Sequence, residues 1–187
     1  MDYLEFTLNA DQGICNALRR IMIADVPIYA IEVVSISKNN GIINDEMLAH
    51  RLGLLPLSSK VSANESLDDF YFTLDVSFDQ DKADSNNVHT IYSGSLIGSS
   101  KDVSLVHNDI ILAALAKGQS ISLKAFIAKG TGFEHAKWSA SCGTTYIDHE
   151  DGSITFKIET TGSLEPIELF QKSIDILDKK LDVLKVF

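Results

Sequence analysis

Histidines and paired carboxylates are the residues of this chain that could carry metal or acid–base chemistry. The histidines are His50, His89, His107, His135 and His149. None belongs to an HExxH motif or to another spacing typical of metal ligands, which favours surface or loop positions for all five. The pairs Asp68-Asp69 and Glu150-Asp151 lie in polar segments, where solvation is the expected role. Acid–base catalysis would need two carboxyl groups in contrasting environments, and nothing here indicates them.

Glycine-rich and nucleophile motifs are equally incomplete. Gly130-Thr131-Gly132 lacks the six-residue frame and the closing Lys-Ser/Thr of a phosphate loop, and the chain has no GxSxG. A triad built from distant residues would leave no local motif, so an enzyme of unknown type stays an alternative. We predict no catalytic residue and no metal ligand in this chain.

The two cysteines, Cys15 and Cys142, stand alone, and neither forms a CxxC pair. A zinc or iron–sulfur site would need more thiolates at short spacing. We therefore expect no cofactor in this chain and reduced thiols, as in intracellular proteins.

Composition excludes further classes of function. The 187 residues carry a formal net charge of −10, with 45% hydrophobic and 22% charged residues. A protein that neutralises many phosphates needs a basic surface, so little or no direct DNA contact is expected. Residues 1–5 do not resemble a signal peptide, and no apolar run is long enough to span a membrane. We expect a soluble, intracellular protein without membrane contact.

Two stretches have the composition of binding surfaces. Arg19 and Arg20 are adjacent cations in an acidic chain; they are either solvated or paired with carboxylates or carbonyls of a partner. Residues 132–138 combine Phe, His, Lys and Trp, as interface anchors often do. The alternative is that Trp138 fills the interior of its own domain.

A long amphipathic helix is predicted over Pro166–Phe187. Its main apolar row has heptad spacing and comprises Ile167, Phe170, Ile174, Leu177, Leu181 and Leu184. A second row comprises Leu169, Ile176 and Val183. At about 100° per residue the two rows cover about 160° of the helix, more than one sheet face needs. The helix either buries both rows in its own core or shares one with another chain.

The remaining chain predicts an α+β fold. A strand at 3–8, a helix capped by Asn9 and stopped before Pro27, a strand at 28–37 and a short helix at 44–52 precede a strand-rich stretch. We expect a discontinuous domain, formed by residues 1–57 and 149–187 as a small antiparallel sheet with helices. Residues 58–148 would form a strand-rich domain inserted into it.

Three motifs resemble the alpha-type subunits of multisubunit DNA-directed RNA polymerases. They are Asn16–Pro27, Asp45–Leu57, and Lys117-Gly118-Gln119 followed by Gly130–Ser139. Their order matches the family, and the resemblance is strongest to its archaeal D subunits and to the third-largest subunits of eukaryotic polymerase II. Ala140 stands where the family often has proline, and the cysteines of its iron–sulfur or zinc-bearing members are missing.

The resemblance implies a non-catalytic assembly subunit. Its helices would pair with a smaller L-type subunit through Ile14, Leu18, Ile21, Met22, Phe170, Ile174, Leu177, Leu181 and Leu184. The second-largest subunit would be recruited through Arg19, Arg20, His135, Lys137 and Trp138. Small N-type and P-type subunits would join, and the catalytic magnesium would belong to the largest subunit. The compartment would be cytoplasmic in an archaeon, and nuclear or viral otherwise. A homodimeric binding module unrelated to transcription is the competing prediction.

Overall fold

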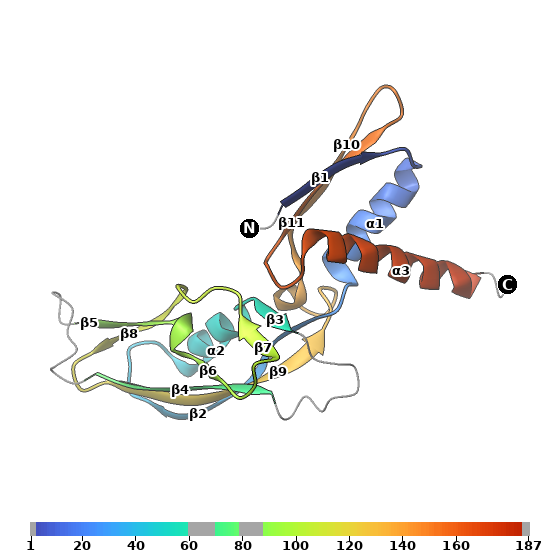
Figure 1. The fold of residues 1–187 in the computed structure, drawn as a ribbon. Helices are drawn as coiled ribbons and strands as arrows, with labels where there is room; N and C mark the ends of the chain where they lie inside the picture. Colours follow the sequence, from blue (N-terminus) through green and yellow to red (C-terminus); the bar gives the residue numbers. More distant parts are fainter. Residues whose placement is uncertain (1–2, 60–69, 79–87, 185–187) are drawn as a thin grey trace. The chain divides into compact units, whose positions relative to one another are not determined.

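The computed structural model describes residues 3–59, 70–78 and 88–184. Its described helices are α1 (Gln12–Ala24), α2 (Asp45–Gly53) and α3 (Pro166–Leu184), with 3₁₀ turns η3 (Ser93–Ser95) and η4 (Ala136–Trp138). Its described strands are β1 (Tyr3–Leu8), β2 (Ile28–Asn39), β3 (Leu57–Ser59), β4 (Tyr71–Ser77), β5 (Val88–Tyr92), β6 (Ile97–Gly98), β7 (Val103–Leu105), β8 (Ile111–Ala116), β9 (Ser120–Gly130), β10 (Ser141–Asp148) and β11 (Ile154–Thr160). Helices and small antiparallel sheets confirm the predicted α+β class (Figure 1).

The chain divides into two compact units. The terminal unit is Met1–Ile28 with Lys129–Phe187, and the central unit is Tyr29–Ala128. These limits differ from the 58–148 expected for the strand-rich middle. The reason is that β2 pairs with β9 in the four-stranded sheet, so most of β2 belongs with the strands that follow it.

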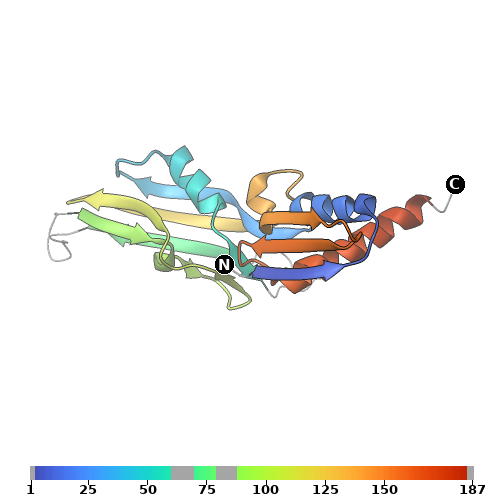
Figure 2. The same cartoon turned by 90° about the horizontal axis from the view of Figure 1, so that it is seen from above.

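The terminal unit is built on a three-stranded antiparallel sheet in the order β1-β11-β10 (Figure 2). β11 alternates as a half-buried strand should, with Ile154, Phe156, Ile158 and Thr160 buried. Helices α1 and α3 cover this face, and the ring of Phe170 on α3 lies 4.7 Å from that of Phe6. Aromatic and aliphatic contacts between α3 and the sheet therefore form the core of this unit.

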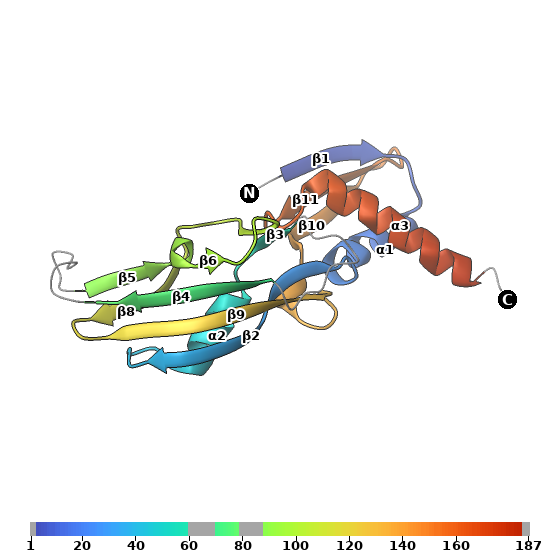
Figure 3. The ribbon, with the colours of Figure 1, turned by 60° about the horizontal axis from the view of Figure 1, so that its bottom comes forward.

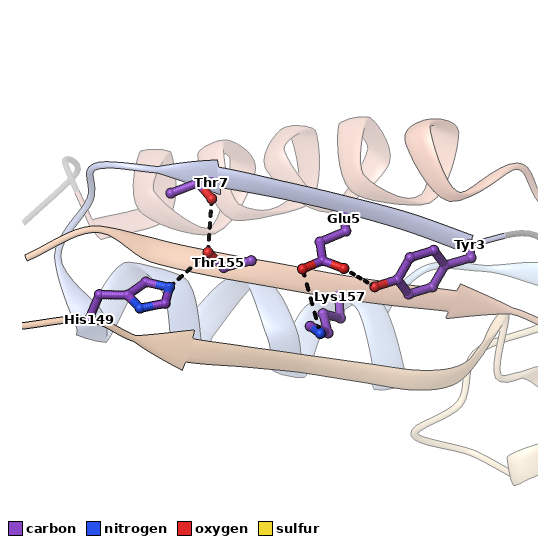
Figure 4. Close-up of polar contacts among 6 residues, drawn as sticks. All are labelled: Tyr3, Glu5, Thr7, His149, Thr155 and Lys157. Atoms are coloured by element: carbon purple, nitrogen blue, oxygen red, sulfur yellow. Dashed lines mark hydrogen bonds and ion pairs between the residues drawn. The ribbon is translucent and has the colours of Figure 1, made fainter.

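The opposite face of the same sheet is polar (Figure 4). Lys157 pairs with Glu5 at 3.5 Å, and the hydroxyls of Thr7 and Thr155 lie 2.8 Å apart. The Nε2 atom of His149 is 2.9 Å from the Thr155 hydroxyl. The pairs Lys157–Glu5 and Thr7–Thr155 support the register of β1 on β11.

The N-cap of helix α1 lies two residues after the cap predicted at Asn9. The carboxylate of Asp11 accepts a hydrogen bond from the Gly13 backbone N–H at 2.7 Å, so Asp11 is the N-cap. The helix ends at Ala24, ahead of Pro27, as expected. Its buried side chains are Cys15, Leu18, Ile21 and Met22.

The central unit contains the sheet β2-β9-β4-β6 (Figure 3) and the pairs β3-β7 and β5-β8. Helix α2 begins after Asn44, as predicted, ends at Gly53, one residue beyond the predicted end at Leu52, and buries Leu48 and Leu52. Residues 110–115, whose short apolar run fits a helix or a strand equally, lie mostly in β8. The pair Asp68-Asp69 and the last predicted helical residues, 185–187, fall outside the described residues, as does the stretch 79–87, whose polar composition predicts a loop. None of the described helices is long and apolar enough to cross a membrane.

Candidate partner-binding surface

Helix α3 exposes a row of apolar side chains at seven-residue intervals. Ile167, Ile174 and Leu181 are 52%, 44% and 46% exposed, respectively. Leu169, by contrast, lies on the side of α3 that faces the sheet and is fully buried. Phe170 and Leu177 are half-buried between these two sides, and the side chain of Leu184 lies outside the described part of the chain. The predicted heptad row is thus divided, with its outer members uncovered.

The predicted dimer residues of α1 divide in the same way. Leu18, Ile21 and Met22 are buried inside the terminal unit, because α1 packs this face against β10 and α3. Ile14, near the start of the helix, is 50% exposed. Of the residues predicted on α1 for a dimer, only Ile14 presents a large apolar surface to another chain.

A groove of about 380 Å³ opens beside α1 and α3. It is lined by Ala17, Arg20, Ile21, Ala24, Asp25, Phe133, Leu177 and Lys180. The ammonium of Lys180 lies 2.6 Å from Oδ2 of Asp25, which joins α3 to the residue that caps α1. The groove therefore brings together Arg20 and Leu177, which were predicted to serve two different partners.

The loop after β9 is held against α1 by backbone contacts. The N–H of Phe133 donates to the carbonyl of Ala24 at 2.8 Å, and the Ser139 hydroxyl donates to the carbonyl of Ile23 at 3.2 Å. Gly132 lies so close to Ile23 that a Cβ atom would collide with its carbonyl oxygen. These contacts fix the position of the loop on α1.

Side chains of this loop face different surroundings. Trp138 is buried against Gly130, where a Cβ atom would collide with the indole, so the ring fills the interior of the unit. Lys137 places its ammonium 4.4 Å from the centre of that ring. The Nδ1 atom of His135 accepts a hydrogen bond from the Lys137 N–H at 3.1 Å, and the rest of this side chain is exposed.

Most of the chain matches one known protein family. Residues 6–181 match the family described as the RNA polymerase Rpb3/Rpb11 dimerisation domain. This chain belongs to that family. The match confirms the resemblance to alpha-type polymerase subunits that the three motifs carry.

Individual relatives agree with this family. The chain is 35% identical to DNA-directed RNA polymerase subunit Rpo3 of Methanocaldococcus jannaschii, over 95% of this chain and 85% of the relative. It is 37% identical to DNA-directed RNA polymerase II subunit rpb3 of Dictyostelium discoideum, over 74% of this chain and 51% of the relative. Subunit 3 of DNA-directed RNA polymerases II, IV and V of Arabidopsis thaliana is 34% identical, over 92% and 62%. The chain thus covers less than two thirds of either eukaryotic relative.

Arg19 and Arg20 of this family member differ in their surroundings. Arg19 donates a hydrogen bond to the Asn16 side chain at 2.9 Å and is half-buried. Arg20 is exposed and makes no ion pair or hydrogen bond with another described residue. Of the two cations, Arg20 is the one whose guanidinium stays available to a carboxylate.

Metal ligands do not gather in the part of the chain that the structure describes: no three His, Cys, Asp or Glu side chains lie together there. Cys15 is buried, and that burial raises the pKa of its thiol, whereas Cys142 is exposed. The exposed apolar row of α3, the groove beside it and the guanidinium of Arg20 are features that can support non-covalent association with another chain.

Phe133 is more exposed than Lys137 and Trp138, two of the residues that were chosen from its loop as partner contacts. It belongs to the predicted loop but not to the residues chosen as contacts, and it is 84% exposed beside the groove. The exposure of the Phe133 side chain depends on contacts that its loop makes with Ile23 and Ala24, which are far away in sequence. A local sequence pattern does not encode these contacts.

Proposed function

We propose that the protein is a non-catalytic assembly subunit of DNA-directed RNA polymerase that heterodimerises with a smaller, L-type subunit. The observation that carries the proposal is the exposed row Ile167, Ile174 and Leu181, in a family named for dimerisation. The names of the relatives, which are polymerase subunits of archaea and eukaryotes, support the transcriptional role.

Apolar burial would drive the association. Fully burying one large aliphatic side chain contributes about 1.5–3 kcal/mol, and these side chains are already about half covered. The partly covered Leu177 and Phe170 of the same helix would add area beside the row, and the exposed Ile14 of α1 would add a further apolar side chain. The sum must exceed the entropic cost of association, so we expect the partner to supply a helix with a matching apolar face.

The finer parts of the proposal follow the family. The terminal unit would be the discontinuous dimerisation domain, and the central unit would be the inserted strand-rich domain. Arg19, Arg20, His135 and Lys137 would contact the second-largest subunit, with Trp138 as the internal support of their loop. N-type and P-type subunits would join the platform. This chain would hold no cofactor and would act in the compartment where its polymerase transcribes.

The test introduces charge into the exposed row. Ile174→Glu with Leu181→Glu should abolish co-purification with the L-type subunit, because two carboxylates would have to be buried unpaired. Both side chains are exposed, so the terminal unit should stay folded, as fluorescence of Trp138 can show. Ile42→Glu alters a more exposed isoleucine, 81% exposed, in the central unit and serves as the control for an added surface charge.

Native mass spectrometry of each complex reads out the result. The wild type and the control should appear as heterodimers or larger polymerase assemblies. A double variant that retains a normal heterodimer would contradict the proposed interface. A wild-type protein that forms only homodimers would contradict the proposed function itself.

A further inference from the structure

The loop between β2 and α2 contains Asn40-Gly41, the one Asn-Gly pair in the sequence. In such a pair the backbone nitrogen of the glycine, which has no Cβ atom to hinder it, can attack the side-chain amide carbon of the asparagine. The attack forms an N–Cγ bond and breaks the Cγ–Nδ2 bond, and the glycine proton leaves with the departing amine as ammonia. Water then opens the resulting succinimide ring at either carbonyl, to aspartate or to isoaspartate.

The nitrogen that would attack is engaged in the folded chain. The N–H of Gly41 donates a hydrogen bond to Oδ1 of Asn39 at 3.0 Å. Asn39 is itself fixed, because its Nδ2 donates to the carbonyl of Ile43 at 2.9 Å and to Oδ1 of Asp45 at 2.6 Å. The Gly41 N–H must therefore leave this acceptor before its nitrogen can lose the proton and attack Asn40.

The amide that would be attacked is engaged as well. Oδ1 of Asn40 accepts hydrogen bonds from the Ser120 N–H at 2.6 Å and from the Ser120 hydroxyl at 3.3 Å. Nδ2 of Asn40 donates to the carbonyl of Gly118 at 3.4 Å, and the Asn40 N–H donates to the carbonyl of Ser120 at 3.3 Å. These bonds tie the loop after β2 to the turn that precedes β9, so both reacting groups are restrained by contacts within the central unit.

We propose that Asn40 is a deamidation site that the folded central unit keeps closed, with Asn39 as the residue that withholds the Gly41 nitrogen. Asn40 is exposed, so water can hydrolyse the succinimide once it forms. The reaction in the folded protein then proceeds at the rate of the unfolded chain multiplied by the fraction of molecules in which this loop is open. Deamidation of Asn40 would therefore mark chains whose central unit has opened, whichever partner the chain binds.

The products of the reaction do not fit the closed loop. Aspartate at position 40 has a carboxylate oxygen in place of the Nδ2 donor, and this oxygen would face the carbonyl of Gly118. Isoaspartate adds a methylene group to the backbone and displaces Gly41, which lies beside the core side chains Leu115 and Ile121. Deamidated chains should therefore have a less stable central unit, and one event should make further opening easier.

Incubation of the full chain in native buffer and in urea, at the same mildly alkaline pH and temperature, tests the site. Peptide mass spectrometry measures the conversion of each asparagine to the acid. We expect Asn40 to react before every other asparagine in urea, and to react more slowly in native buffer by about tenfold or more, equivalent to about 1.4 kcal/mol or more. Equal rates for Asn40 in the two buffers, or another asparagine that reacts first in urea, would overturn the proposal.

A pair of variants then tests the role of Asn39. Asn39→Ala removes the acceptor of the Gly41 N–H and should speed deamidation of Asn40 in native buffer by about tenfold, with little change in urea. Asp45→Ala is the matched control, because it removes a partner of the Asn39 Nδ2 but leaves Oδ1 facing Gly41, so its native rate should stay close to that of the wild type. Circular dichroism shows whether each variant is folded.

Amide hydrogen exchange of the wild-type chain tests the same contact without a substitution. The Gly41 N–H should exchange more slowly than in urea, because it is bonded to Asn39. A native deamidation rate that Asn39→Ala leaves unchanged, or a Gly41 N–H that exchanges as fast as in the unfolded chain, would show that Asn39 does not protect the site.

Discussion

The two sides of α3 both carry apolar residues, but the inner side packs on the chain's own sheet and the outer side is left exposed. On the inner side Leu169 is fully buried and the ring of Phe170 packs on those of Phe6 and Phe156, so this side stabilises the chain's own fold. On the outer side Ile174 and Leu181 stay about half exposed. Apolar residues on one helix can thus divide between folding and association, and only the direction of each side chain decides which role it has.

Truncation on each side should have opposite consequences. Leu169→Ala should lower the free energy of unfolding by about 2–5 kcal/mol, because it leaves a cavity in a fully packed site. Ile174→Ala should change that free energy by less than about 0.5 kcal/mol in the isolated chain, because the side chain is exposed there. Urea titration followed by fluorescence of Trp138, the only tryptophan, measures both in the terminal unit.

The same pair of variants should exchange their effects in the complex. Ile174→Ala should weaken binding to the L-type subunit, whereas Leu169→Ala should weaken it only as far as it unfolds the terminal unit. Equal unfolding free energies for the two variants would remove the distinction between the sides of α3.

Helical periodicity predicted two apolar rows on α3 that are too wide to be buried on one sheet face. It could not show which row packs on the sheet and which is left for a partner. The row favoured for a partner included Phe170 and Leu177, and the structure turns both partly inward. Rotation of α3 about its axis is set by the rings of Phe6 and Phe156, which belong to strands at opposite ends of the chain. Such contacts are tertiary, so no pattern within the helix can encode them.

In the loop at 130–139, too, tertiary contacts decide which side chains are buried and which are exposed. Its composition predicted a binding surface, and three motifs predicted the family correctly. Composition could not show that Gly130 leaves room for the Trp138 ring, or that Gly132 presses the chain against Ile23 and so exposes Phe133. Which aromatic residue is internal and which is presented depends on these close approaches of the backbone.

The helix-covered face of the terminal sheet contains a buried hydroxyl group, that of Thr160, among apolar side chains. The hydroxyl of Thr160 is buried and has no hydrogen-bond partner among the described residues, while its neighbours on that face of β11 are apolar. Thr160→Val keeps the shape and removes the unpaired group, so the free energy of unfolding should rise by up to about 1–2 kcal/mol. A loss of stability in the same urea titration would mean that the hydroxyl is satisfied in solution, and Thr155→Val on the polar face is the control.

The ion pair between Lys180 and Asp25 links α3 to the end of α1 at the boundary of the two sides. Because the lysine is largely exposed, Lys180→Met should lower the free energy of unfolding by no more than about 0.5–1 kcal/mol, and the difference should fade as salt screens the charges. Lys172→Met is the matched control, since Lys172 pairs with Glu168 at 2.7 Å within α3 itself. Urea titrations at low and high ionic strength compare the two. A loss of several kcal/mol for Lys180→Met alone would mean that the pair, rather than apolar packing on the inner side, fixes α3 on α1.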